Sequence, residues 1–235
     1  MLHGRNDDVL ETYLARYLAE GLASGAAALV VTSATRRQTL CRKLALDGID
    51  IEACARSERL VFLDARTTLE AICVDGKPDA ARFRAVVGAR IERIARRFDV
   101  LAYGEMVGLL WEQRDERGAI ALEALWGELQ RSCTFELLCA YPIDVFGPDF
   151  DERRIDPILC QHNELVSAHP KLRRRLDRAM DDVLGHRAAH ARFLMKSEVP
   201  RGDWGEVSEG EATLLWLRKN LPRHAEEIVD SLRVR

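Results

Sequence analysis

The chain has no long apolar run, no paired-cysteine motif and no strong excess of one charge. No stretch approaches the roughly 18 consecutive apolar residues that suggest a membrane span. The six cysteines are scattered, with no CxxC pair, which is typical of buried thiols in a reducing cytosol. A formal net charge of −3 excludes a global basic field for nucleic acid. We therefore expect a soluble, cytoplasmic protein that binds neither nucleic acid nor a membrane.

Catalytic motifs are also missing. There is no G-x-S-x-G, no cluster of metal ligands and no Cys–His pair with a defensible geometry. His186 and His190 are spaced i, i+4, but they lack the glutamate of HExxH and a third ligand. Cys160 and His162, spaced i, i+2, point to different faces of a helix. The sequence therefore predicts no metal, no cofactor and no enzyme activity.

Strand-like and helix-like segments alternate through the first 140 residues. Short apolar runs, typical of buried parallel strands, occur at Ala26–Thr32, Leu60–Asp64, Asp99–Tyr103 and Phe135–Ala140. Helices are expected over Asp7–Ala23, Thr35–Asp47, Ala65–Val74, Asp79–Arg97, Glu105–Gln113 and Glu116–Cys133. This alternation predicts an α/β fold of three layers, in which helices flank both faces of a parallel sheet.

The pattern becomes wholly helical after Pro142. Helices are expected over Ile155–Ala168, from Pro170 to about Met195, over Ser208–Leu221 and over Pro222–Arg233. We therefore predict a core domain at residues 1–147 and an all-helical C-terminal module at residues 170–235. The basic run Lys171–Arg175 is partly neutralised by the aspartates that follow, which favours a solvated helix face over a nucleic-acid contact.

Polar and aromatic side chains gather where the third and fourth predicted strands end. Ligands of parallel α/β sheets bind outside these strand ends, so the side chains are expected to line one pocket. The candidate ligand-binding residues are Tyr103, Glu105, Trp111, Cys139, Tyr141 and His162.

Each candidate also has a purely structural interpretation. Glu105 suits the N-terminus of a helix, where the helix dipole stabilises a carboxylate. Trp111 suits the hydrophobic core, and Cys139 suits an inert buried thiol. Tyr141, just before Pro142, suits a side chain that fills the edge of the sheet. His162 suits a hydrogen-bonded structural imidazole. The sequence leaves both interpretations open.

The order of elements up to about residue 75 resembles the core of RecA- and KaiC-like ATPases. In those proteins the phosphate loop G-x-x-x-x-G-K-[ST] lies just before the first helix. Here that place is taken by His3–Asp8, which has no lysine, no second glycine and two carboxylates that repel phosphate. The resemblance implies the fold with a degenerate nucleotide site, and it implies no ATPase activity.

A nearer resemblance, over roughly residues 5–170, is to the MEDS family, a sensory domain first recognised in a regulator of dichloromethane metabolism. The matching motifs are Leu18–Leu22, Tyr103–Met106, Leu110–Trp111, Leu122–Trp126, Leu138–Pro142 and Ile158–His162. The family normally begins with an apolar strand after an early histidine, whereas here only Met1–Gly4 precedes the first helix. The resemblance implies a sensory domain for small organic molecules, with residues 148–169 as its connecting helix.

The sequence therefore predicts a non-catalytic sensory protein. A small organic molecule or a signalling partner would bind at the strand ends. Residues 170–235 would relay this event to a signalling protein or to a second copy of the chain, in transcriptional or stress signalling. Two alternatives remain open: a nucleotide-dependent KaiC-like enzyme with an atypical phosphate loop, and a ligand-free oligomerising scaffold.

Overall fold

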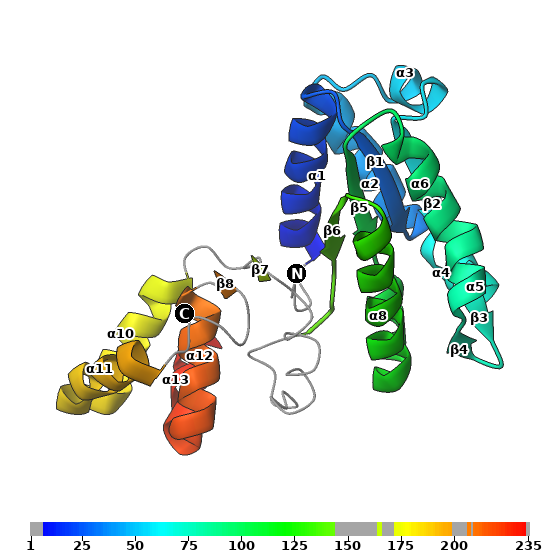
Figure 1. Cartoon of the computed structure of the whole chain (residues 1–235). Helices are drawn as coiled ribbons and strands as arrows, with labels where there is room; N and C mark the ends of the chain where they lie inside the picture. The colour runs from blue at the N-terminus through cyan, green and yellow to red at the C-terminus, as the bar shows by residue number, and fades with distance from the viewer. Residues whose placement is uncertain (1–6, 144–163, 166–171, 199–205, 208, 234–235) are drawn as a thin grey trace. The chain divides into compact units, whose positions relative to one another are not determined.

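The computed structural model describes residues 7–143, 164–165, 172–198, 206–207 and 209–233 (Figure 1). The chain forms two compact units, and the boundary between them lies after Pro142. The first unit contains the main sheet and the second contains the C-terminal helices. None of the helices in the described ranges is long and apolar enough to cross a membrane.

A parallel sheet of four strands forms the centre of the first unit (Figure 1). The strands are β1 (Ala27–Thr32), β2 (Leu60–Asp64), β5 (Val100–Gly104) and β6 (Glu136–Cys139). Their order is β2-β1-β5-β6, and each neighbouring pair is parallel. β1 and β5 are buried along their whole length, as expected for central strands covered on both faces. All four predicted strands are confirmed to within one residue at each end.

Helices precede and connect the strands of this sheet. They are α1 (Asp7–Ala23), α2 (Ala34–Leu46), α3 (Ile51–Arg56), α4 (Ala65–Ile72), α5 (Ala80–Phe83), the π turn η1 (Arg84–Gly88), α6 (Ala89–Ala95), α7 (Met106–Glu112) and α8 (Glu116–Ser132). α1 lies beside α2, where Lys43 Nζ donates a hydrogen bond to Thr12 Oγ1 at 3.1 Å.

The helices cover both faces of the sheet. A Cβ atom on Gly21 of α1 would lie only 2.1 Å from Leu101 of β5, so α1 packs closely on that face. Trp126 of α8 packs instead on Gly104, 3.5 Å from where a Cβ atom would lie. Residues 101 and 104 point to opposite faces of a strand. The predicted three-layer α/β fold is therefore confirmed.

Two local features of the first unit differ from the expectation. The helix expected over Asp79–Arg97 consists of α5, the π turn η1 and α6. The segment before it forms a hairpin of β3 (Cys73–Val74) and β4 (Lys77–Pro78). Its turn residues, Asp75 and Gly76, both have positive φ, as a tight two-residue hairpin requires.

The second unit is built mainly from α10 (Leu172–Leu184), α11 (Ala188–Glu198), α12 (Glu209–Asn220) and α13 (Pro222–Arg233). α10, α12 and α13 pack together through fully buried side chains such as Leu176, Leu214 and Ile228.

Two expectations for the second unit are wrong in detail. The single helix expected up to Met195 is broken by a 3-10 turn, η2 (Gly185–Arg187), where Gly185 has φ +54°. The unit is also not entirely helical, because β7 (Glu164–Leu165) pairs in parallel with β8 (Glu206–Val207). β7 replaces two residues of the helix expected over Ile155–Ala168, and the other residues of that segment up to 163 lie outside the described ranges.

Candidate functional site

The predicted site residues form two clusters, on opposite faces of the sheet, near the C-terminal ends of β5 and β6. Tyr103 and Glu105 lie on the face covered by α1 and α2. Cys139, Tyr141 and Trp111 lie on the face covered by α8. His162, the sixth candidate, lies outside the described residues. The five described candidates therefore do not share one set of contacts.

Glu105 is the centre of the first cluster and is only 8% exposed. The backbone N–H of Ser33 donates a hydrogen bond to Oε2 at 2.9 Å, and the Tyr103 hydroxyl donates to Oε1 at 3.0 Å. The guanidinium of Arg36 also donates to Oε1. One cation and two neutral donors therefore stabilise this carboxylate, as a buried charge requires.

The fold explains why Glu105 reaches α2. β1 and β5 are neighbours, and the N–H of Glu105 itself bonds to the carbonyl of Val31 at 3.1 Å. Ser33, two residues further along, is the N-cap of α2 and its Oγ accepts from the N–H of Arg36 at 3.3 Å. The carboxylate therefore ties the end of β5 to the start of α2.

The structure places Glu105 at the N-terminus of its own helix, at the N-cap position of α7, although its side chain accepts no capping hydrogen bond from α7. The carboxylate accepts hydrogen bonds from Ser33, Arg36 and Tyr103 instead. Arg36 in turn lies 3.9 Å from a carboxylate oxygen of Glu11 on α1.

The second cluster is centred on Glu123 of α8, which is not among the site residues predicted from the sequence. Glu123 is 5% exposed. The hydroxyl of Tyr141 donates a hydrogen bond to its Oε1, and the thiol of Cys139 donates to its Oε2 at 3.6 Å. The ring of Trp111 meets the ring of Tyr141 edge to face, with centroids 6.2 Å apart. We call these four residues the Glu123 cluster.

Burial sets the protonation states of the donors in both clusters. Burial and the neighbouring Glu105 raise the pKa of Tyr103 well above its usual range. In the same way, burial and Glu123 raise the pKa values of Tyr141 and Cys139. All three groups therefore stay protonated and act as hydrogen-bond donors. A protonated buried thiol is a poor nucleophile, so Cys139 suits binding or packing rather than covalent catalysis.

A signal for Glu123 was present in the sequence. Ala119, Leu122 and Trp126 are spaced at helical intervals around position 123, and all three are buried. A glutamate within this apolar stripe has to be buried with the stripe, and a buried carboxylate needs donors. The amphipathic pattern of α8 would therefore have been sufficient to select Glu123.

α7 positions Trp111 against Tyr141. A Cβ atom on Gly108 would lie 2.8 Å from the carbonyl oxygen of Ala140, so the helix approaches the chain beyond β6 closely at this point. Trp111 lies three residues further along α7, which is about one turn and on the same side of the helix. The absence of a side chain at Gly108 therefore allows the aromatic contact in the Glu123 cluster.

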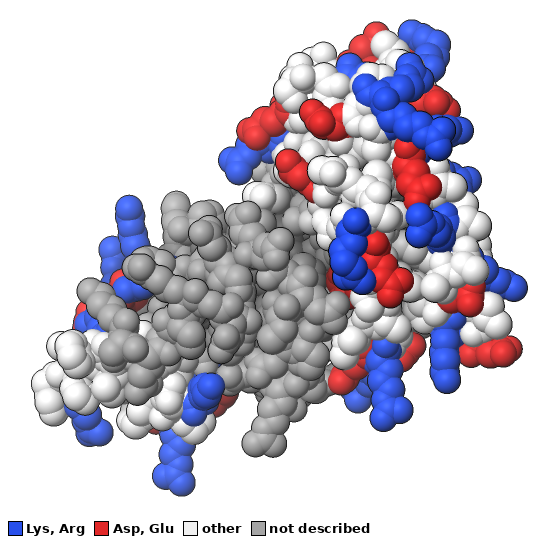
Figure 2. Space-filling view, in the orientation of Figure 1, with Lys and Arg blue, Asp and Glu red and all other residues white. Residues whose placement is uncertain are grey.

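Charges of both signs mix on the face of the first unit shown in Figure 2. Among the ion pairs of this unit, Arg93 and Arg97 both lie close to Glu58, at 3.1 Å and 3.9 Å. Arg56 likewise pairs with Glu52 at 3.4 Å. Such pairing weakens the attraction of these arginines for an external anion.

The fold and these clusters define the class: a three-layer α/β domain with buried polar residues gathered at the C-terminal ends of its parallel strands. The chain belongs to the MEDS family, since the model of that family, described as "MEthanogen/methylotroph, DcmR Sensory domain", matches residues 2–163. Neither the curated proteins nor the solved structures provide a match. The MEDS resemblance is therefore confirmed, whereas the resemblance to RecA- and KaiC-like ATPases stays a prediction.

Proposed function

We propose that the chain is a non-catalytic sensory protein that binds a small organic molecule at the Glu123 cluster and passes this signal to its C-terminal unit. Membership of a sensory-domain family supports the sensory role. Sensing of a small molecule needs a largely apolar site with a few fixed polar groups. The Glu123 cluster has this composition, with two aromatic rings, a thiol and one carboxylate.

The observation that carries the proposal is the hydrogen bond from Tyr141 to Glu123. Tyr141 is the second-last residue of the first unit, which ends at Pro142. A ligand that competes for Glu123 moves Tyr141 and therefore moves the backbone that enters the second unit. The ligand has this effect only if it binds one of the two arrangements more tightly.

The first cluster, formed by Glu105 with Ser33, Arg36 and Tyr103 and called the Glu105 cluster below, is a weaker candidate for the ligand. Its carboxylate already accepts three hydrogen bonds, one of them from a guanidinium. A ligand would have to replace a buried ion pair there, at a cost of several kcal/mol. We assign Tyr103 and Glu105 to the framework that holds β5 against α2.

Native mass spectrometry of the full chain, purified from its own host, tests the ligand site. We expect a retained small molecule in the wild type, and its loss in Tyr141→Phe and Glu123→Gln. Glu52→Gln, which alters an exposed glutamate of α3, is the matched control and keeps the molecule. Absence of any retained molecule, or equal retention in all variants, contradicts the proposal.

Residues 170–235 are proposed to pass the signal to a signalling protein or to a second copy of the chain. Sedimentation velocity compares the full chain with a chain that ends at residue 168. We expect self-association, or binding of a partner co-purified from the host, in the full chain only. Equal behaviour of the two chains contradicts the relay through the C-terminal unit.

A further inference from the structure

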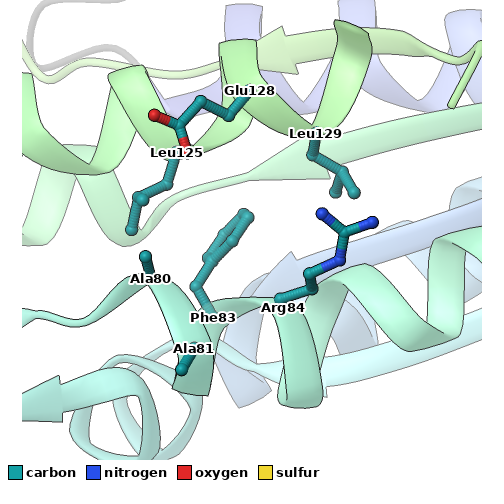
Figure 3. A pocket seen from close by; sticks show the side chains of 7 residues that line it. All are labelled: Ala80, Ala81, Phe83, Arg84, Leu125, Glu128 and Leu129. Atoms are coloured by element: carbon teal, nitrogen blue, oxygen red, sulfur yellow. The ribbon is translucent and has the colours of Figure 1, made fainter. Parts of the chain in front are cut away.

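A pocket of about 230 Å³ lies between α8 and the segment formed by α5 and η1 (Figure 3). None of its lining residues belongs to the Glu105 or Glu123 cluster. Drug-sized ligands usually occupy pockets of roughly 300–1,000 Å³. This pocket therefore suits a smaller molecule.

The inner surface of the pocket is apolar. Phe83 and Leu129 contribute to it and are almost fully buried, while Leu125 is half-buried. The ring of Trp126 packs edge to face against the ring of Phe83, with a centroid distance of 5.0 Å. A rigid aromatic ring and two leucines favour the apolar part of a ligand.

Two opposite charges stand on facing walls of this pocket. Glu128 projects from α8 and Arg84 from the α5–η1 wall (Figure 3). Arg84 is 63% exposed and uses Nη2 to bind Glu92 at 2.9 Å. A guanidinium has five N–H donors, so this ion pair leaves it able to bind a further acceptor. Glu128 is exposed and makes no ion pair with any described residue.

The π turn η1 builds the wall that carries Arg84. It runs from Arg84 to Gly88, and a Cβ atom on Gly88 would lie 3.4 Å from Leu129 Cδ1. The helix therefore packs tightly on α8 near Gly88, and the pocket lies at the other end of the turn, beside Arg84. π turns are rare and occur frequently at functional sites.

We infer that this pocket binds an apolar α-amino acid as a zwitterion. Its carboxylate pairs with Arg84, its ammonium pairs with Glu128, and its side chain lies on Phe83 and the leucines. An α-amino acid carries its two charges on neighbouring groups, so its head bridges a guanidinium and a carboxylate on facing walls. An amphiphile with a single charge pairs with only one of the two side chains, Arg84 or Glu128. This site is additional to the ligand site proposed at the Glu123 cluster.

Isothermal titration of the full chain with four related probes tests this chemistry. The probes are L-leucine, 4-methylpentanoate without the ammonium, 3-methylbutylamine without the carboxylate, and glycine without the side chain. We expect L-leucine to bind, and each of the other three to bind at least about tenfold more weakly, because each lacks one interaction. Absence of L-leucine binding at millimolar concentration overturns the inference.

Variants of the lining residues test which charge of the ligand pairs with Arg84 and which pairs with Glu128. Arg84→Gln weakens L-leucine roughly tenfold but does not weaken 3-methylbutylamine, because the ammonium is repelled by the guanidinium and does not pair with it. Glu128→Gln weakens L-leucine but does not weaken 4-methylpentanoate, for the same reason with the charges reversed. Leu125→Trp fills the pocket and abolishes binding, while Arg93→Gln, on the exposed side of α6, is the matched control.

Two further results separate L-leucine binding in this pocket from non-specific binding and from the ligand site proposed at the Glu123 cluster. Unchanged L-leucine affinity in Leu125→Trp, with a normal circular dichroism melting curve, overturns the pocket as the site. Tyr141→Phe leaves L-leucine affinity unchanged, since Tyr141 belongs to the Glu123 cluster. Failure of the Glu123 ligand site therefore does not imply failure of this one.

Discussion

Two buried glutamates at the same end of the sheet have different surroundings. The Arg36 guanidinium donates a hydrogen bond to Glu105, and the Tyr141 hydroxyl and the Cys139 thiol donate hydrogen bonds to Glu123. At the residue scale, Glu105 ties the end of β5 to the start of α2, whereas the bond from Tyr141 to Glu123 lies close to the end of the first unit.

Glu105→Gln should destabilise the protein by about 2–4 kcal/mol, because it removes the negative charge that pairs with the Arg36 guanidinium in a buried site. Urea denaturation monitored by circular dichroism measures this change. The control, Glu52→Gln, alters a glutamate whose side chain is 87% exposed and should change stability by less than about 1 kcal/mol. Equal effects of the two substitutions would show that Glu105 is not part of the framework.

The buried thiol of Cys139 should make the fold less stable at alkaline pH. Its pKa is raised above the usual 9.0 in the folded protein, so the unfolded chain loses this proton first as the pH rises. Unfolding then becomes more favourable, by up to about 1.4 kcal/mol per pH unit, between the unfolded and the folded pKa.

Comparison with Cys139→Ser isolates this titration. The stability difference between the wild type and the variant, measured by urea denaturation, should be constant below about pH 8 and should shrink above pH 9. The other ionisable groups contribute to both proteins and largely cancel. A difference that stays constant up to about pH 10 would refute the assignment.

Most of these residues could be predicted from the sequence, but their partners could not. The strand ends predicted Tyr103, Glu105, Cys139 and Tyr141 together, because the apolar runs stop there. Which face each side chain occupies depends on strand register, and a shift of one residue reverses it. The pairing of Glu105 with Arg36 joins residues 69 positions apart, and no local pattern in the sequence specifies such a contact.

At the element scale, close approach of α7 to the chain beyond β6 depends on Gly108. Gly108→Ala places a methyl group 2.8 Å from the carbonyl oxygen of Ala140, and backbone cannot move aside cheaply. We expect a loss of roughly 1–3 kcal/mol from this overpacking. The same substitution should also disturb the contact between Trp111 and Tyr141, which tryptophan fluorescence reports.

Gly127→Ala is the matched control, since Gly127 also lies inside a helix, α8. There the nearest atom to an added Cβ is Arg131 Nη1, at 3.8 Å. Alanine is the better helix former, so this substitution should stabilise the protein by up to about 1 kcal/mol. Thermal and urea denaturation of both variants checks the pair, and the same sign of change in both would contradict the packing described for α7.

The differences between the predicted and the observed helices have local causes. The π turn η1 inserts one extra residue into an otherwise continuous helix, and the apolar periodicity on either side hides it. Gly185 breaks the predicted long helix because it adopts positive φ, a conformation open to glycine wherever it occurs. The confirmed strands and helices are those with long apolar patterns, for which burial rather than local backbone geometry decides the structure.

At the scale of the whole molecule, the two compact units should unfold as separate cooperative transitions. Differential scanning calorimetry of the full chain should show two transitions. Gly108→Ala in the first unit should lower only one of them. Leu176→Ala, which removes a fully buried side chain of α10 in the second unit, should lower only the other, by the equivalent of about 2–5 kcal/mol.

A shortened chain checks independently which unfolding transition belongs to which unit. A chain that ends at residue 168 should retain the transition sensitive to Gly108→Ala and lose the other. A ligand held by the Glu123 cluster should raise the first transition, since binding to the folded state stabilises it. If the signal passes along the backbone from Tyr141, the same ligand should also shift the second transition, and Tyr141→Phe, which should lose the ligand, should abolish both shifts. One shared transition, lowered by both substitutions, would show instead that the units fold as one.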